Sequence, residues 1–484
     1  MSLILDAAWK LRRERDYVLL YKLSYVGFVD DYKLITPQAA ILFSLFDGER
    51  TTEQVAEALS YVTGLHPDIS VQTVNQFLDE YGNCLVDISQ VPKEQIRIYN
   101  PLKFVMNTND VDLTPKRLIA PLFLVYMVTN ACCANCIYCY AGKQEEDGSY
   151  DGGLMPLPRV KEFLQETAEL EIPTIIISGG DPFMHPNILE ILEQTISLGI
   201  LPNVSTKCIL PKGVVDRLSE IGLKRLQISV DSPYSETVAF MTGVRNENYL
   251  QGIISTIKRV VRAGITVETN MVITSYNLRH IPELVDILQS LGVRSIGLSN
   301  YVISFYRHSD DILLSEEDLD WLEETVNTLR EKYKGVDIKY GGRQLAESLL
   351  EKVVKIGTKE REKYFARRTR CTAGMRQLAI YPDGKVVPCE EAPPTKEFVF
   401  GNLKRQSIKE IWNSERLIEV IRPPREKFIG QPCYDCLDFY ECHAYLGRCY
   451  MHALKAYGTP YAPPPECPKA PSQSGLFLTS KSCE

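Results

Sequence analysis

The chain has 484 residues, of which 45% are hydrophobic and 24% charged, proportions typical of a folded globular protein with two to four domains. The 54 basic and 62 acidic residues give a net charge of −8, which argues against a nucleic-acid binder that depends on phosphate neutralisation. No apolar run reaches the roughly 18 residues of a membrane-spanning helix, and the acidic Asp6 comes too early for a signal peptide. We therefore expect a cytoplasmic protein without nucleic-acid or membrane partners.

Residues 1–95 combine strand patterns with three short helices. Strand-forming residues occur at Tyr17–Leu23 and Cys84–Ile88, and Pro37 opens an apolar helix. Thr51 and Gln54 have the spacing of a capping box before a second helix. The pattern predicts a third helix over 71–81 and, for the whole segment, a small winged-helix-like α+β domain. Residues 96–120, which contain Pro101 and Pro115, are expected to form a linker.

Six strand patterns alternate with helix patterns between residues 121 and 335. Glycines at 199, 222, 264 and 292 follow four of the expected helices, as helix C-caps do. This alternation predicts a parallel α/β sheet with its chemistry at the carboxyl ends of the strands. The expected strands are Leu122–Val128, Thr174–Ser178, Asn203–Thr206, Leu226–Val230, Thr266–Ile273 and Ser295–Leu298.

A basic stretch that ends at Arg370 leads us to expect a helical bridge over 336–370. Residues 371–484 have little periodicity and many turn residues, so bound metal is expected to organise this segment. The 14 cysteines support that view, because only Cys84 and Cys208 stand apart from two clusters. Without an export signal, clustered cysteines indicate metal ligands rather than disulfides, and buried structural cysteines would be scattered.

The first cysteine cluster contains the spacing Cys132-x3-Cys136-x2-Cys139 directly after the first strand of the sheet. Three thiolates can hold three irons of a cubane cluster and leave the fourth iron open for substrate chemistry. A structural zinc site is the alternative, but it needs four ligands. Cys133 is poorly suited to supply the fourth, because adjacent cysteines rarely point at one ion.

Residues 129–140, TNACCANCIYCY, resemble the signature of radical S-adenosylmethionine (SAM) enzymes, including the aromatic Tyr138 before the third cysteine. The resemblance implies a partial (β/α)6 barrel in which Cys132, Cys136 and Cys139 hold a 4Fe–4S cluster. In that family SAM chelates the open iron. Its reductive cleavage yields a 5′-deoxyadenosyl radical, which abstracts hydrogen from the substrate.

Further strand ends resemble the SAM-binding motifs of the family. Ser178 precedes a sequence similar to the family's Gly-Gly-Glu-Pro motif, although aspartate here replaces glutamate. Another segment resembles the Ser-x-Asp strand end that reaches the ribose of SAM. The tripeptide Ser205-Thr206-Lys207 and Asn270 are equally compatible with a turn and with a cofactor contact. The implied SAM-binding residues are Tyr138, Gly179, Gly180, Asp181, Pro182, Ser205, Ser229, Asp231 and Asn270.

The C-terminal cysteines resemble the SPASM domain, an extension of radical SAM peptide-modifying enzymes that carries two auxiliary 4Fe–4S clusters. Leu446 occupies the position of an expected cysteine, and Cys449 is taken as the displaced equivalent. The resemblance implies a distal cluster on Cys433, Cys436, Cys442 and Cys467, and a proximal cluster on Cys371, Cys389 and Cys449. The fourth proximal ligand could come from the substrate, from Cys483, or from a carboxylate such as Asp435 or Asp438. A pair of zinc sites is the alternative.

The N-terminal segment resembles the RiPP recognition element, the leader-binding domain of peptide-maturation pathways, and is similar to the peptide chaperone of pyrroloquinoline quinone synthesis. The similarity lies in Leu34–Pro37, Phe46–Gly48 and Thr51–Ala56. That domain captures an extended leader peptide as an added strand. A DNA-binding winged helix is the alternative, but residues 71–81 contain no Lys or Arg.

Together these features lead us to expect a radical SAM enzyme that modifies a ribosomally synthesised precursor peptide by hydrogen abstraction and cross-link formation. Expected cofactors are SAM and three 4Fe–4S clusters, and the expected electron donor is a flavodoxin or ferredoxin. A thioether is slightly favoured over a C–C bond, because an open proximal cluster could bind a substrate thiolate. Alternatives are oxidation of a protein side chain, as in sulfatase maturation, a small-molecule substrate, and a non-enzymatic iron–sulfur sensor or electron carrier.

Overall fold

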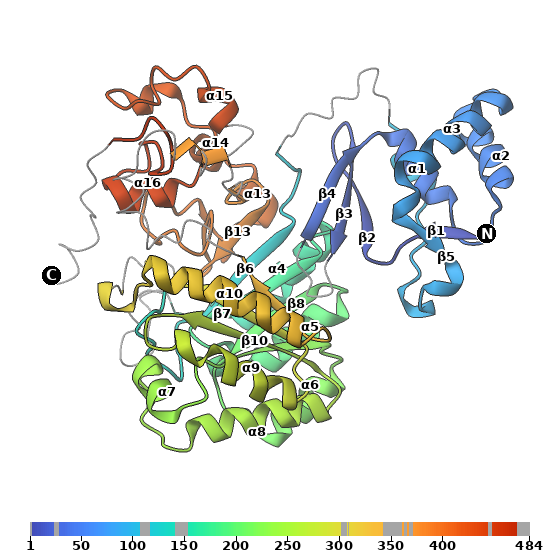
Figure 1. Ribbon diagram of the computed structural model, residues 1–484. Coiled ribbons are helices and arrows are strands. Elements are labelled where there is room, and N and C mark those ends of the chain that lie inside the picture. The colour runs from blue at the N-terminus through green and yellow to red at the C-terminus, as the bar shows by residue number, and fades with distance from the viewer. Residues whose placement is uncertain are drawn as a thin grey trace. The chain divides into compact units, whose positions relative to one another are not determined.

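The computed structural model describes residues 2–23, 29–106, 117–140, 153–301, 307, 309–341, 361–362, 365–366, 371–443 and 448–471. The chain divides into two compact units, Met1–Ile119 and Ala120–Glu484, each of which is visible in Figure 1. Among the described residues, no helix is long and apolar enough to cross a bilayer.

The first unit is a small α+β domain, as predicted. An antiparallel sheet has the order β2-β3-β4, and two short strands, β1 and β5, pair separately. Three helices follow the larger sheet in the chain, and the expected capping box starts the second one at Thr51. The elements are β1 (Leu3–Leu5), β2 (Trp9–Arg13), β3 (Val18–Leu23), β4 (Val29–Ile35), α1 (Pro37–Leu45), α2 (Thr52–Thr63), α3 (Pro67–Tyr81) and β5 (Leu85–Asp87).

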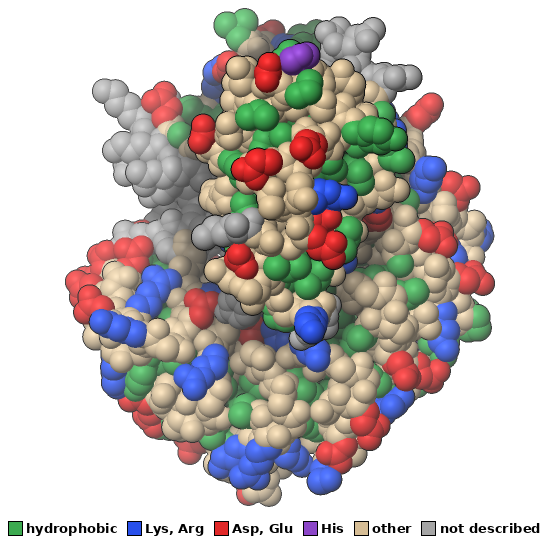
Figure 2. All heavy atoms as spheres, turned by 90° about the vertical axis from the view of Figure 1, so that its right-hand side faces the viewer, with side chains coloured by type: hydrophobic (Ala, Val, Ile, Leu, Met, Phe, Trp, Pro, Cys, Tyr) green, Lys and Arg blue, Asp and Glu red, His purple; other side chains and the backbone are tan. Residues whose placement is uncertain are grey.

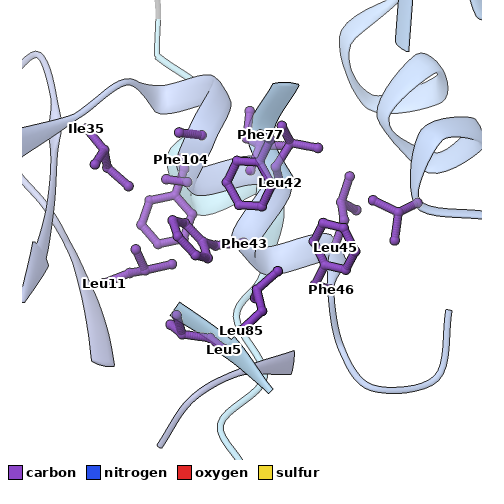
Figure 3. Packing of buried hydrophobic residues seen from close by; sticks show 14 of the residues in the cluster. Leu5, Leu11, Ile35, Leu42, Phe43, Leu45, Phe46, Phe77, Leu85 and Phe104 are labelled. Carbon is purple, nitrogen blue, oxygen red and sulfur yellow. The ribbon is translucent and has the colours of Figure 1, made fainter. Parts of the chain in front are cut away.

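Aromatic side chains from distant parts of the sequence form the core of the first unit. Phe43 of α1 packs edge-on against Phe77 of α3, with ring centroids 4.7 Å apart. Phe104, from the short 3-10 helix η4 (Pro101–Phe104), is fully buried in the same core, as Figure 3 shows. The first unit therefore includes part of the segment that was expected to be a linker. The prolines of this segment suggested a linker, but Phe104 buries its ring in the core of the unit.

The second unit is built on a ten-stranded sheet with the order β12-β11-β10-β9-β8-β7-β6-β13-β14-β15. Six of its strands are the predicted ones, and they run parallel to one another. These are β6 (Phe123–Thr129), β7 (Thr174–Gly179), β8 (Leu201–Thr206), β9 (Arg225–Ser229), β10 (Thr266–Ile273) and β11 (Ser295–Asn300).

Helices connect these parallel strands, and the four predicted glycine caps all have positive φ values between 74° and 89°. Only glycine adopts this left-handed conformation without a steric cost from Cβ. The sequence analysis did not predict the short helix α7, which follows the loop after β9. The helices are α4 (Leu157–Glu169), α5 (Ile188–Ser197), α6 (Lys212–Glu220), α7 (Ser235–Thr242), α8 (Tyr249–Arg262), α9 (Ile281–Ser290) and α10 (Glu316–Lys332).

The expected helical bridge over 336–370 begins instead with β12 (Asp337–Tyr340), which pairs in parallel with β11. The open edge of the sheet favours a strand there, and the short alternating sequence DIKY suits one. The described residues of this range beyond 341 are 361–362 and 365–366. The rest of the predicted bridge lies outside the described residues, as does the tail from 472.

The cysteine-rich segment joins the sheet on the other side of β6. Its first strand, β13, pairs in parallel with β6, and two antiparallel strands extend the sheet beyond it. The elements are β13 (Gln377–Ile380), β14 (Lys385–Val387), β15 (Gly401–Asn402), α13 (Ile408–Trp412), α14 (Glu415–Ile421), α15 (Phe439–Glu441) and α16 (Tyr450–Tyr457). This pairing joins the cysteine-rich segment to the strand that leads into the first cysteine cluster.

We predict that residues 1–119 fold alone and that Phe104→Ala lowers their free energy of unfolding by about 3–5 kcal/mol, the usual cost of removing a buried aromatic ring. Urea denaturation of the fragment measures this. Tyr61→Ala is the control: Tyr61 is 92% exposed, so the change should stay within about 0.5 kcal/mol. A fragment of residues 1–95 that is as stable as 1–119 would contradict the prediction.

Candidate active site

The three signature cysteines lie in the loop directly after β6, at the carboxyl edge of the parallel sheet. Although the loop has no regular structure, backbone hydrogen bonds hold it against α7. The Asn135 N–H donates to the Thr242 carbonyl at 2.7 Å, and the Ile137 N–H donates to the Met241 carbonyl at 2.9 Å. The unpredicted α7 therefore helps to fix the position of the thiols.

Burial makes the Cys136 thiol a weak acid in the free chain. Cys136 is 7% exposed, and desolvation raises its pKa to about 11, although the nearby Lys207 ammonium acts in the opposite direction. Metal coordination stabilises the thiolate, so an iron–sulfur cluster would supply the charge compensation that the buried site lacks. Cys132 and Cys139 are partly buried in the same apolar cluster.

The predicted glycines Gly179 and Gly180 contact the cysteine loop itself. The Gly180 N–H donates to the Thr129 carbonyl at 2.6 Å. A Cβ atom on Gly180 would lie 2.1 Å from the Ala131 carbonyl oxygen, and Gly179 has a φ of +126°. Only glycine permits so close an approach of two backbones. The resemblance implied that both glycines contact SAM, and the structure shows their close approach to the loop that carries Cys132.

The carboxylate of Asp181 is buried and accepts hydrogen bonds from neighbouring residues. The residue is 2% exposed, and the carboxylate accepts hydrogen bonds from the Thr206 hydroxyl at 2.9 Å and from the Lys207 N–H at 2.6 Å. The Phe183 N–H and the Cys133 thiol also donate to it, at 3.0 and 3.9 Å. The carboxylate thus ties the end of β7 to the end of β8 and to the cysteine loop. Pro182, the last residue of the motif, begins the short 3-10 helix η5 (Pro182–Met184).

Asp231 lies at the centre of a buried polar network that the sequence analysis only partly identified. Its Oδ2 accepts hydrogen bonds from the Tyr138 hydroxyl and from Lys207 Nζ, both at 2.6 Å. Its Oδ1 is buried and has no hydrogen-bond partner in the part of the chain that the structure describes. Burial alone would lower the pKa of Lys207, but Asp231 and the nearby Cys136 raise it above its usual value.

In the sequence analysis Lys207, as part of Ser205-Thr206-Lys207, was left open between a turn and a cofactor contact. The structure places its ammonium 5.5 Å from the Tyr138 ring centroid and within electrostatic range of Cys136 and Cys132. The Tyr249 hydroxyl donates a hydrogen bond to the Lys207 backbone carbonyl at 2.6 Å. Lys207 therefore stays a buried cation beside the thiols.

The remaining predicted SAM contacts lie on adjacent strands. Ser229 of β9 is opposite Asn270 of β10, and Ser205 of β8 is opposite Gln227 of β9. Asn270 Oδ1 accepts a hydrogen bond from the Ser299 hydroxyl at 2.9 Å. These side chains and the orphaned Asp231 oxygen supply the acceptors and donors that a polar cofactor such as SAM requires, so the site fits that group.

The C-terminal thiols of each predicted set are neighbours in the structure, and their role as metal ligands stays a prediction. Cys371, Cys389 and Cys449, the proximal set, pack into one core with Val125 of β6 and Ala379 of β13. Cys433, Cys436, Cys442 and Cys467, the distal set, influence one another electrostatically. Burial raises the pKa of Cys371 and of Cys433 to about 12.

The structure narrows the candidates for a fourth proximal ligand. Asp435 and Asp438 are exposed and belong to the loop of the distal set, so neither suits the proximal set. Cys483 lies outside the described residues. Glu390, directly after Cys389, is a partly buried carboxylate whose pKa is raised, mainly by desolvation. The sequence analysis did not single it out.

We predict that Gly180→Ala displaces the cysteine loop, since the new methyl group would overlap backbone atoms that cannot rotate away. The reconstituted variant should carry about four irons fewer than the parent chain, because one cubane is lost, and should form little 5′-deoxyadenosine. Gly213→Ala in α6 is the control, because nothing lies within 4 Å of its Cβ position. Normal iron content and SAM cleavage in Gly180→Ala would contradict this explanation.

Comparison with known proteins agrees with this geometry. Residues 126–288 match the radical SAM superfamily, and residues 371–437 match the SPASM iron–sulfur cluster-binding domain. The PqqA peptide cyclase of Methylobacterium sp. (strain 4-46) is 26% identical over 362 residues, 73% of this chain and 88% of that protein. The AdoMet-dependent heme synthase of Methanosarcina barkeri (strain Fusaro) is 23% identical, over 63% of this chain and 86% of that protein.

Among solved structures, Streptococcus suis SuiB bound to its precursor peptide SuiA shares this fold, with a TM-score of 0.65 and 17% identity. The match covers 98% of this chain and 100% of that one. It therefore includes the N-terminal α+β domain as well as the barrel and the cysteine-rich segment. The chain is a radical SAM enzyme that carries a SPASM iron–sulfur domain and is related to peptide cyclases.

Proposed function

We propose that this enzyme modifies a ribosomally synthesised precursor peptide, by removing hydrogen from it and closing a cross-link. The sequence matches do not by themselves select this substrate, because the relatives include both a peptide cyclase and a heme synthase. The observation that carries the proposal is the additional N-terminal unit. A protein of the same fold over its whole length, SuiB, is known with its precursor peptide bound.

The first unit offers an edge for an added peptide strand. Among the described strands, β4 pairs only with β3, so its outer edge is available for main-chain hydrogen bonds from an extended leader. The same unit exposes apolar side chains, including Ile69 and Val71 of α3, each 49% exposed. On the face shown in Figure 2, hydrophobic side chains are interspersed with charged ones. Such a surface suits an amphipathic peptide.

The residues at the barrel's carboxyl edge would hold the radical-generating cofactors. Cys132, Cys136 and Cys139 would bind the 4Fe–4S cluster. Asp231, through Oδ1, would accept from a hydroxyl of SAM, with Ser229 and Asn270 beside it. When bound, SAM and the cluster supply the radical that takes a hydrogen atom from the peptide.

The chain's own residues prepare this site electrostatically. Lys207 provides a buried positive charge next to the thiolates of Cys132 and Cys136, and Asp231 holds that charge in place. The Tyr138 phenol stays protonated and donates to Asp231, because burial raises its pKa well above its usual value. The donors and acceptors around SAM are therefore fixed before it binds, which lowers the cost of organising the site.

The two sets of C-terminal thiols would hold two auxiliary clusters, giving three 4Fe–4S clusters in the chain. Four thiolates would bind all four irons of the distal cluster, whereas the three proximal thiolates would leave one iron without a protein ligand. A cysteine thiolate of the peptide could bind at that position, and coordination would lower its pKa. This arrangement favours a thioether over a C–C bond. A flavodoxin or ferredoxin as electron donor remains a prediction from the sequence.

The proposal predicts a loss of two hydrogen atoms from the peptide for each cross-link formed, measured by mass spectrometry after anaerobic incubation with SAM and a reductant. The peptides to test are those encoded by short reading frames beside the gene. A thioether would also remove one free thiol, which iodoacetamide labelling detects. The variant with Cys132, Cys136 and Cys139 all replaced by alanine should be inactive, and Cys84→Ala, outside the three sets, should retain activity.

SAM cleavage without any peptide modification, but with turnover of a small molecule such as a tetrapyrrole precursor, would instead favour a small-molecule enzyme. A protein side chain oxidised to an aldehyde, without a cross-link, would favour the side-chain-oxidising alternative.

We predict that deleting residues 1–119 slows peptide modification more than about tenfold at low peptide concentration, since losing 1.4 kcal/mol of leader binding already has that effect. Slow, uncoupled formation of 5′-deoxyadenosine should persist, because the thiols and the SAM contacts all lie in the second unit. Adding residues 1–119 as a separate chain tests whether the loss concerns binding. An unchanged rate of peptide modification after the deletion would contradict leader binding.

A further inference from the structure

Arg448 is a buried cation between the two sets of C-terminal thiols. The residue is 5% exposed and directly precedes Cys449, a member of the proximal set. Its guanidinium binds Nδ1 of His443, the residue after Cys442 of the distal set, and Arg448 lines the same cavity as Cys371 of the proximal set. Its charge also acts on Cys433 and Cys449. The guanidinium is thus within electrostatic range of both sets.

The described contacts of Arg448 are neutral. Its Nε donates to Nδ1 of His443 at 3.0 Å, and Nη1 donates to the Ala462 carbonyl at 3.2 Å. The guanidinium carbon lies 5.0 Å from the centroid of the Phe428 ring. Because Nδ1 of His443 accepts the hydrogen bond from Arg448, it carries no proton, and the imidazole is neutral.

No carboxylate pairs with Arg448 among the residues that the structure describes. Other buried cations of the same unit do have such a partner: Lys207 is 2.6 Å from Asp231, and Lys455 is 2.8 Å from Glu391. Burying a charge without an opposite charge is costly, and proteins avoid it unless another group compensates. The compensating charge for Arg448 must therefore come from something other than a described carboxylate.

The surrounding thiols can supply that charge. A cubane held by thiolates is negative overall, and its reduction potential depends on nearby charges and hydrogen bonds. A cation in a medium of low dielectric constant stabilises the reduced, more negative form. We propose that Arg448 is the shared counter-ion of the two auxiliary iron–sulfur sites and raises the reduction potential of both. This inference rests on the proposed assignment of the two ligand sets.

Lys469 is a suitable control because it touches only one set. Its Nζ lies 3.1 Å from Sγ of Cys436, and its side chain is 51% exposed. Solvent screens an exposed charge. Replacing Lys469 should therefore shift only the distal potential, and by less than replacing Arg448.

The experiment compares Arg448→Met, Arg448→Lys and Lys469→Met in the full chain, with Cys132, Cys136 and Cys139 replaced by alanine so that only auxiliary clusters give signals. Redox titration followed by electron paramagnetic resonance measures the potential of each cluster. Arg448→Met should shift both potentials to more negative values, and Arg448→Lys should restore most of the shift. If the parent chain itself binds no auxiliary iron, the ligand assignment is wrong, and this proposal is overturned with it.

Other outcomes are equally decisive. Unchanged potentials in a fully loaded Arg448→Met variant would show that Arg448 only packs against Phe428, and would overturn the proposal. Loss of auxiliary iron in Arg448→Met but not in Arg448→Lys would support it, because the two variants differ in charge. Equal loss of iron in both variants would indicate a purely steric role and would also overturn it.

Discussion

The parallel pairing of β13 with β6 is the interaction on which the architecture of the second unit depends. Strand β6 leads into the loop of the radical SAM cysteines, and β13 lies between Cys371 and Cys389 of the proximal set. Hydrogen bonds between the two strands therefore attach the cysteine-rich segment to the barrel. Val125 of β6 shares an apolar core with these proximal cysteines. A segment with few strands of its own thus obtains a rigid support from the barrel.

Buried cations recur beside the buried thiols, and they are compensated in different ways. Lys207 has a carboxylate partner in Asp231, so the radical SAM site holds its cation in place before any cofactor binds. Arg448 has only neutral described contacts, which links its charge to the clusters themselves. Both arrangements follow from the low dielectric constant of the interior, where a charge without compensation is costly.

In the proposed function the two units divide the work between recognition and chemistry. The N-terminal unit has its own aromatic core, and among the described strands β4 pairs on one side only. The proposed leader would pair there by main-chain hydrogen bonds, which do not depend on a particular side-chain sequence. The second unit contains all three sets of thiols. Binding the leader apart from the reacting residues lets one enzyme hold a long, flexible substrate while its chemistry concerns a few atoms.

Local patterns in the sequence determined much of this protein. Strand and helix periodicity located six parallel strands, and the glycines at 199, 222, 264 and 292 located helix ends. Cysteine spacing separated a first cluster from a C-terminal one, and the resemblance to the SPASM domain implied the division of the second cluster into two sets. These features depend on residues close together in the chain. Asp231 and Tyr138 each follow a parallel strand, and the carboxyl ends of parallel strands meet at one edge of the sheet. Their positions in the sequence are therefore consistent with one site, and in the structure they are hydrogen-bonded to each other.

Only the tertiary structure decided which groups compensate one another. Lys207, Phe104 and Arg448 carry no decisive local signal, because a lone lysine, phenylalanine or arginine is most often an ordinary surface or core residue. Their roles arise from neighbours distant in sequence: Asp231 for Lys207, Phe43 for Phe104, and both cysteine sets for Arg448. Similarly, β12 forms where a helical bridge was expected, because the open edge of β11 supplies hydrogen-bond partners that the sequence of that segment does not reveal.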